Sequence, residues 1–130
     1  MTPAHFVSAI RALHADAVPR AVVLVEDRDF LDALVDALSS ELADIATVDA
    51  KIGRLPFVIF KGSGRNFREP SVRILPVGGP LTGPVEAVLA DASTIRAHKA
   101  GKWWKATLLP RFGKGRLVAV DAAAQPDART

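Results

Sequence analysis

The chain of 130 residues contains no cysteine and no tyrosine. Without cysteine it can form no disulfide, use no thiol nucleophile and offer no thiolate to a metal ion. No apolar run approaches the roughly 18–20 residues that a membrane-spanning helix needs. The N-terminus also lacks the basic stretch and apolar core of a secretory signal peptide. We therefore expect a protein of the cytoplasm, or of a virion assembled there, with no membrane partner.

Catalytic and metal-binding motifs are equally scarce. The histidines are scattered, and His5 and His14 are too far apart on one expected helix to share a metal ion. No serine has His and Asp companions at a spacing typical of an acyl-transfer triad. The glycine-bearing run 61–65 lacks the Gly-Lys-Ser/Thr of a P-loop and the third glycine of a dinucleotide fingerprint. The sequence thus favours a non-enzymatic role with no cofactor and no metal.

The chain does have a strong division of charge along its length. Residues 1–50 carry three cations and nine anions, whereas residues 51–130 carry fourteen cations and five anions, for a net charge of +3. Such a division suits a protein whose basic part faces a polyanion such as nucleic acid. It equally suits a protein whose acidic face meets the basic face of the next copy.

An apolar fraction of 49% is that of a globular protein. We expect a single domain over residues 1–121 and an irregular C-terminal tail over 122–130. Apolar periodicity predicts an α+β fold with an α/β-like start, in which a mixed sheet of about five to seven strands packs with two to three helices. The expected helices cover 3–15, a stretch that begins near Asp27 or Asp29, and one that begins at Gly83-Pro84. The expected strands are 21–25, 45–49, 57–60 and 72–77.

The last third of the chain has two interpretations. Residues 93–97, 103–109 and 116–121 are compatible with a meander of three strands, which we favour because Gly101 and the β-branched Thr94 and Ile95 disfavour a long helix. The alternative is that the helix from Gly83-Pro84 continues to about His98. The expected core residues are Val23, Leu24, Phe30, Leu34, Phe57, Ile59, Ile74 and Val118.

Cations and aromatic residues alternate in the second part of the chain. Lysine and arginine neutralise phosphates, and rings such as those of Trp103, Trp104 and Phe112 stack on bases, a combination that single-stranded nucleic acid requires. At least one of the two tryptophans should belong to the core, because adjacent strand residues point to opposite faces. The candidate nucleic-acid-binding or partner-binding residues are Lys61, Arg65, Arg68, Arg73, Lys102, Lys105, Arg111 and Lys114.

The sequence favours a structural or assembly protein. Its size and layout are similar to those of phage tail and neck components, which implies head-to-tail oligomers with further copies or other assembly proteins as partners. Asp32 and Asp36, one turn apart on the outer side of the second helix, are the candidate oligomer interface. The loop 61–71 would reach a neighbour as a basic arm. The alternative is a nucleic-acid-binding module that uses the basic surface of residues 51–116.

A second alternative is a metal-dependent enzyme. Glu26 ends the first expected strand, a later strand ends in Gly78-Gly79, and a last strand ends in Asp121. This order resembles that of Toprim-type metal nucleases, and the resemblance implies a degenerate enzyme with acids after the first strand as metal ligands. Two departures stand against it: Asp27 replaces the glycine usual after the first acid, and the paired acids expected at the last strand are reduced to Asp121. The simpler interpretation is that the aspartates cap a helix.

Overall fold

A six-stranded mixed sheet forms the centre of the molecule, with strand order β2-β3-β4-β1-β5-β6. The computed structural model describes residues 2–16, 18, 20–50, 55–61, 72–113 and 115–123. The strands are β1 (Ala21–Val25), β2 (Ala46–Asp49), β3 (Phe57–Phe60), β4 (Val72–Pro76), β5 (Ala87–Ala90) and β6 (Arg116–Ala119). The helices are α1 (Pro3–Ala15), α2 (Arg28–Glu41), α3 (Ala92–His98), the π-helical η1 (Trp104–Leu108), α4 (Leu109–Phe112) and α5 (Val120–Ala123).

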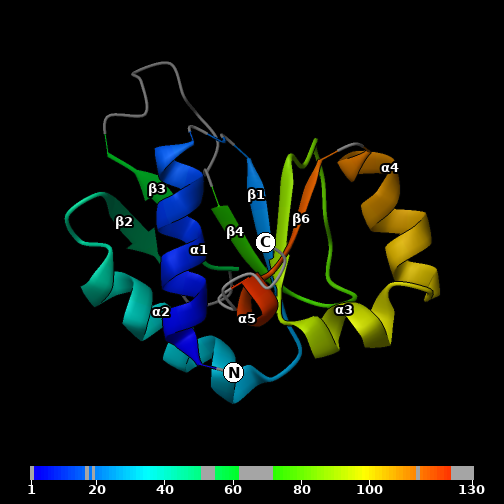
Figure 1. Cartoon of the computed structure of the whole chain (residues 1–130), viewed down its shortest axis with the longest axis horizontal. Coiled ribbons are helices and arrows are strands. Elements are labelled where there is room, and N and C mark those ends of the chain that lie inside the picture. Colours follow the sequence, from blue (N-terminus) through cyan, green and yellow to red (C-terminus); the bar gives the residue numbers. More distant parts are fainter. Residues whose placement is uncertain are drawn as a thin grey trace.

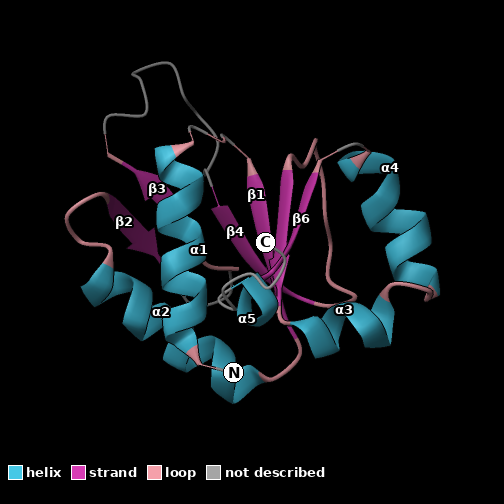
Figure 2. Cartoon of the chain, in the orientation of Figure 1, coloured by secondary structure: helices cyan, strands magenta, loops and turns pink. Residues whose placement is uncertain are grey.

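The sheet is parallel on one side and antiparallel on the other (Figures 1 and 2). Strands β4, β1, β5 and β6 run parallel, whereas β2 and β3 continue the sheet in antiparallel pairing beyond β4. All five residues of β1 are buried, because this strand lies between β4 and β5 and is covered on both faces. The predicted α+β class with a mixed sheet is confirmed.

Helices α1 and α2 cover one face of the sheet (Figure 1). In α1 the apolar residues recur at helical spacing, so Phe6, Ile10 and Leu13 are all buried. Helix α2 begins after Asp27, whose carboxylate accepts a hydrogen bond from the backbone N–H of Asp29 at 3.2 Å. Of the two aspartates that were candidates for this cap, Asp27 is the capping residue.

Helices α3, η1 and α4 cover the opposite face. Side chains of β1 alternate in direction, so Val23 packs in the core beneath α1 and α2, while its neighbours Val22 and Leu24 pack in a second core. Trp104, Leu108 and Phe112 close this second core from the helical side. The two cores hold the two helical layers on opposite faces of one sheet.

Two predictions for the last third of the chain are wrong. Residues 93–97 and 103–109 lie mainly in α3, η1 and the start of α4, and only the third predicted strand exists, as β6. The helix expected from Gly83-Pro84 is also absent, since β5 occupies that region. The strand preference of Thr94 and Ile95 amounts to a few tenths of a kcal/mol. The hydrogen bond from Thr94 to the buried Asp91 and the packing of Ile95 against the second core outweigh it.

Half of the predicted core residues are fully buried: Val23, Leu24, Leu34 and Ile74 have no exposed surface. Phe30, Phe57 and Val118 are half-buried. Ile59 is 39% exposed, so its assignment to the core is wrong. On β3 the neighbouring Val58 and Phe60 point toward α1 and α2, which leaves Ile59 on the other side of the strand. Residues 124–130 of the expected tail lie outside the described residues.

Candidate nucleic-acid interface

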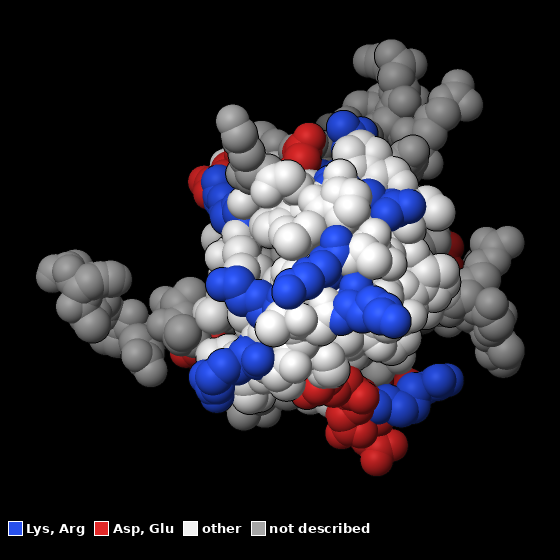
Figure 3. Space-filling model, turned by 90° about the vertical axis from the view of Figure 1, so that its right-hand side faces the viewer, with Lys and Arg blue, Asp and Glu red and all other residues white. Residues whose placement is uncertain are grey.

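The helical layer of α3, η1 and α4 concentrates positive charge. Residues 92–120 contain seven lysines and arginines and no aspartate or glutamate. Four of these cations form what we call the basic face, and all four side chains are exposed: Arg96 on α3, Lys99 at the C-cap of α3, Lys102 in the helical turn that precedes η1, and Lys105 on η1. Figure 3 looks onto this side of the molecule and shows lysine and arginine side chains spread across it, with carboxylates gathered along its lower edge.

The local sequence explains why these cations face solvent. Arg96 lies on α3, and Lys99 is the C-cap three residues later with a helical backbone conformation, so both lie on the same side of the helix. In η1 the buried Trp104 and Leu108 turn toward the sheet, which leaves Lys105 on the outer side. Within the described part of the chain, none of the four cations of the basic face forms an ion pair.

The aromatic side chains of this region do not share the surface with the cations. Trp104 is 2% exposed and Phe112 is 9% exposed, and both belong to the second core. Trp103 is half-buried, and its indole N–H donates to the carbonyl oxygen of Gly79 at 3.0 Å. The expectation that a tryptophan belongs to the core is confirmed. Base stacking on Trp104 is incompatible with its burial.

The structure brings only some of the predicted binding residues together. Lys102, Lys105 and Arg111 share the helical layer, where the guanidinium of Arg111 donates to the carbonyl oxygen of Thr107 at 2.9 Å. Lys61 follows β3, and its ammonium group donates to the carbonyl oxygen of Ala43 at 2.7 Å.

Arg73 lies on β4 and donates to the carbonyl oxygen of Thr82 at 2.7 Å. Neither Lys61 nor Arg73 belongs to the helical layer of α3, η1 and α4. Arg65, Arg68 and Lys114 lie outside the described residues.

The acidic residues of α2 lie on the other side of the sheet from the basic face. Asp32 and Asp36 are both exposed on α2, and α2 packs over the core opposite to that of η1 and α4 (Figure 1). Near the end of α2, the guanidinium of Arg11 pairs with Asp44 at 3.0 Å and lowers the pKa of that carboxyl group. Asp32 and Asp36 thus lie on the opposite side of the sheet from the basic face, whereas Arg116, from the basic part of the sequence, pairs with Asp16 at 2.9 Å on the α1 side.

A second group of polar residues gathers where the parallel strands end. Glu26 follows β1, Asp91 follows β5, and Asp121 lies just after β6. Because these strands are parallel, the three carboxylates lie at the same, carboxyl-terminal end of the strands. Glu26 Oε1 lies 3.2 Å from the hydroxyl oxygen of Thr94, whose proton is donated to Asp91, and Glu26 Oε2 lies 2.5 Å from Nε2 of His98. These contacts tie α3 to the end of β1.

Asp91 is the buried member of this group, at 5% exposure. Burial opposes its ionisation, but hydrogen bonds from the hydroxyls of Ser93 and Thr94, each at 2.5 Å, outweigh that cost and hold the pKa of Asp91 below its ordinary value. Asp121 accepts from the backbone N–H of Ala92 at 2.8 Å. Sequence reasoning missed Asp91, although it follows an apolar run just as Glu26 does.

The strand-end group lends no support to the Toprim-type interpretation. Glu26 and Asp121 are engaged with α3, and among the residues that the structure describes no three His, Asp or Glu side chains are arranged to hold a metal ion. Gly78 follows β4 in a turn at φ 93°, a conformation that favours glycine for backbone reasons. Glu26, Asp121 and Gly78 therefore have structural roles, in holding α3 and in forming a turn.

Comparisons with known proteins identify no relative. Over the described residues, no helix has the length and apolar character needed to cross a membrane. No family model matches the chain, and searches of curated proteins and of solved structures find no significant match.

Proposed function

We propose that the basic face binds the phosphate backbone of nucleic acid without reading its sequence. The observation that carries this proposal is the set of four exposed cations, Arg96, Lys99, Lys102 and Lys105, in a stretch of chain without any carboxylate. Each cation that meets a phosphate releases condensed counterions, and this release favours binding at low salt.

The composition of the basic face favours nucleic acid over a dry protein interface. Protein interfaces are depleted of lysine and are built around aromatic or aliphatic anchors. Within α3, η1 and α4, Leu109 is the large apolar side chain that the structure leaves exposed, at 43%. A lysine-rich surface with a single exposed leucine suits a polyanion, which needs charge and little apolar contact.

Because the aromatic rings are buried, we expect contacts with the phosphate backbone of the nucleic acid and no stacking on its bases. Single-strand binders stack bases on exposed aromatic rings, whereas Trp104 lies in the core and the indole N–H of Trp103 is held by Gly79. We therefore expect duplex binding that is insensitive to base sequence.

The salt dependence of binding tests this proposal. Fluorescence anisotropy with two duplexes of unrelated sequence should give equal affinities, and the logarithm of the affinity should fall linearly with the logarithm of salt concentration. Four phosphate contacts correspond to a slope of about −3.6, at about −0.9 per contact. Failure to bind either duplex at low salt would contradict the proposal.

The acidic surface of α2 favours assembly as a second function. Asp32 and Asp36 lie on one face of the sheet and the basic face covers the other, so successive copies could join head to tail through heterologous contacts. A role of the phage tail or neck kind would use such a contact, and either function would place the protein in the cytoplasm or in a virion.

Light scattering tests the assembly role. Wild-type oligomers should dissociate in high salt, and Asp32→Lys with Asp36→Lys should abolish them at low salt, because like charges would then face each other. A wild-type monomer at every salt concentration would rule this second function out.

A further inference from the structure

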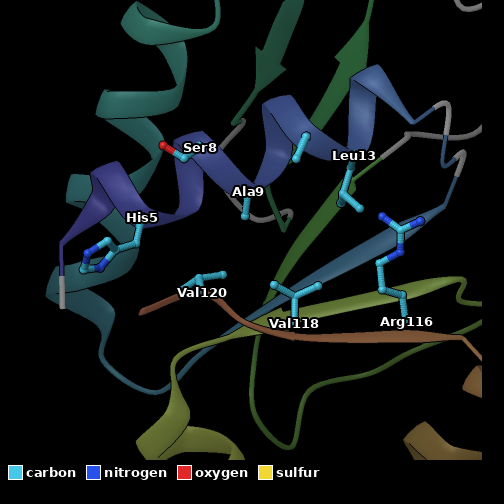
Figure 4. Close-up of a pocket in the computed structure, with 8 residues that line it drawn as sticks. His5, Ser8, Ala9, Leu13, Arg116, Val118 and Val120 are labelled. Carbon is cyan, nitrogen blue, oxygen red and sulfur yellow. The ribbon is translucent and has the colours of Figure 1, made fainter. Parts of the chain in front are cut away.

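A cavity of about 250 Å³ lies between α1 and the β6 edge of the sheet. Its walls are apolar: Ala9, Ala12 and Leu13 come from α1, and Val118 and Val120 come from β6 and the start of α5. Figure 4 shows these side chains lying between the helix and the strand. The cavity is below the range of about 300–1,000 Å³ typical of sites for drug-sized ligands, so it suits a small molecule.

Polar groups stand at the two ends of the cavity. Arg116 lies at one end and His5 at the other, with Ser8 on the same stretch of α1 as His5 (Figure 4). The buried Nδ1 atom of His5 has no hydrogen-bond partner among the described residues. An apolar passage with a cation at one end is the arrangement that holds a carboxylate with an aliphatic tail.

Arg116 is already engaged with one carboxylate. Its guanidinium donates to Asp16 at 2.9 Å, and its side chain is 48% exposed, so the pair lies at the solvent-facing end of the cavity. A guanidinium has five N–H donors in a planar fork that matches carboxylate geometry. A ligand carboxylate can therefore take the place of Asp16 on the same group.

We propose that this cavity binds a short aliphatic carboxylate, with its carboxylate on Arg116 and its chain along the apolar walls toward His5. The stretch of α1 from His5 to Leu13 rises by roughly 12 Å at about 1.5 Å per residue, which sets the length of the tail. This site lies on the α1 face of the sheet, opposite the basic face, and the proposal is independent of nucleic-acid binding.

Titration with octanoate, followed by backbone amide chemical shifts, tests the proposal. We expect saturable one-site binding with the largest shifts in α1 and β6, and at least tenfold weaker binding of butanoate, because each buried methylene contributes to affinity. 1-Octanol should bind at least tenfold more weakly than octanoate, since it lacks the charge. Equal binding of octanol, shifts outside α1 and β6, or no saturation would overturn the proposal.

Three variants separate the charge from the apolar walls. Arg116→Gln should weaken octanoate about tenfold and leave 1-octanol unchanged. Asp16→Asn should tighten octanoate several-fold, because the internal competitor is gone. Ala12→Leu, at an exposed position of α1 that tolerates a helix-forming residue, should block octanoate by filling the cavity. Wild-type octanoate affinity in folded Arg116→Gln or Ala12→Leu would overturn the assignment.

Discussion

Apolar residues that the sequence assigns to the core differ in how much they contribute to the free energy of unfolding, because they differ in exposure. Leu34 has no exposed surface on α2, whereas Ile59 on β3 is 39% exposed. Both are apolar and both follow a regular apolar pattern, so the sequence alone predicts burial for each. The structure separates them because α1 and α2 cover one side of β3, and Ile59 points to the other.

Truncation of these two side chains should separate them energetically. We expect Leu34→Ala to lower the free energy of unfolding by about 2–5 kcal/mol, because it leaves a cavity in the core beneath α2. Ile59→Ala should cost well under half of that, since much of its side chain already contacts water. Urea denaturation of both variants measures the difference, and equal losses would mean that the core is misassigned.

At the scale of helices and strands, α3 depends on polar contacts to the strand ends. Its first turn carries Ser93 and Thr94, both bonded to the buried carboxylate of Asp91, and its last turn carries His98 beside Glu26. A short helix gains little stability from its own backbone. We infer that these contacts hold the helical layer, and with it the basic face, against the sheet.

The lowered pKa of Asp91 makes a prediction about pH. Because the folded-state pKa lies below the ordinary value of 3.8, the unfolded state binds its proton first as pH falls. The stabilisation is therefore complete well above pH 3.8 and is lost as pH falls through that value toward the folded pKa.

Asp91→Asn should remove this part of the acid dependence and should cost about 1–2 kcal/mol at neutral pH. The measurement is urea denaturation of wild type and variant at several pH values. Asp32→Asn is the matched control, because Asp32 is exposed on α2 and should leave the profile unchanged. Parallel profiles for wild type and Asp91→Asn would contradict the prediction.

The elements that the sequence predicted well are those with a clear apolar period or a compact apolar run. The helix over Pro3–Ala15 and the strands over 21–25 and 57–60 match the structure, and β2 and β4 lie within one residue of the expected ranges. Residues 87–90 were assigned to a helix because a strand buried on both faces is continuously apolar and has no period to read.

At the scale of the whole molecule, the order of charges along the chain did not fix where those charges lie in space. Lys102 and Lys105, two of the predicted binding residues, lie on the basic face. Lys61, the first residue of the predicted loop, follows β3, and Arg73 lies on β4. Arg96 and Lys99 belong to the same run of cations in the sequence but were not among the candidate binding residues. The cavity beside β6 could not be predicted from the sequence, because its walls come from α1 and β6, at opposite ends of the chain.

The position of the basic face allows the effect of particular cations on nucleic-acid affinity to be distinguished from the effect of net charge. Nucleic-acid affinity that depended only on net charge would fall equally whichever cations were removed. Binding by the basic face requires instead that removal of cations from η1 and its preceding turn has the larger effect.

A matched pair of double variants tests this central claim most directly. Lys102→Gln with Lys105→Gln and Arg11→Gln with Lys61→Gln change the net charge equally, but Arg11 and Lys61 contact the α2–β2 region near Asp44 and Ala43. Duplex affinity should fall strongly in the first variant, with the salt slope reduced by about two, and only slightly in the second. Equal losses, or a larger loss in the Arg11 and Lys61 variant, would contradict the proposal that the basic face binds nucleic acid.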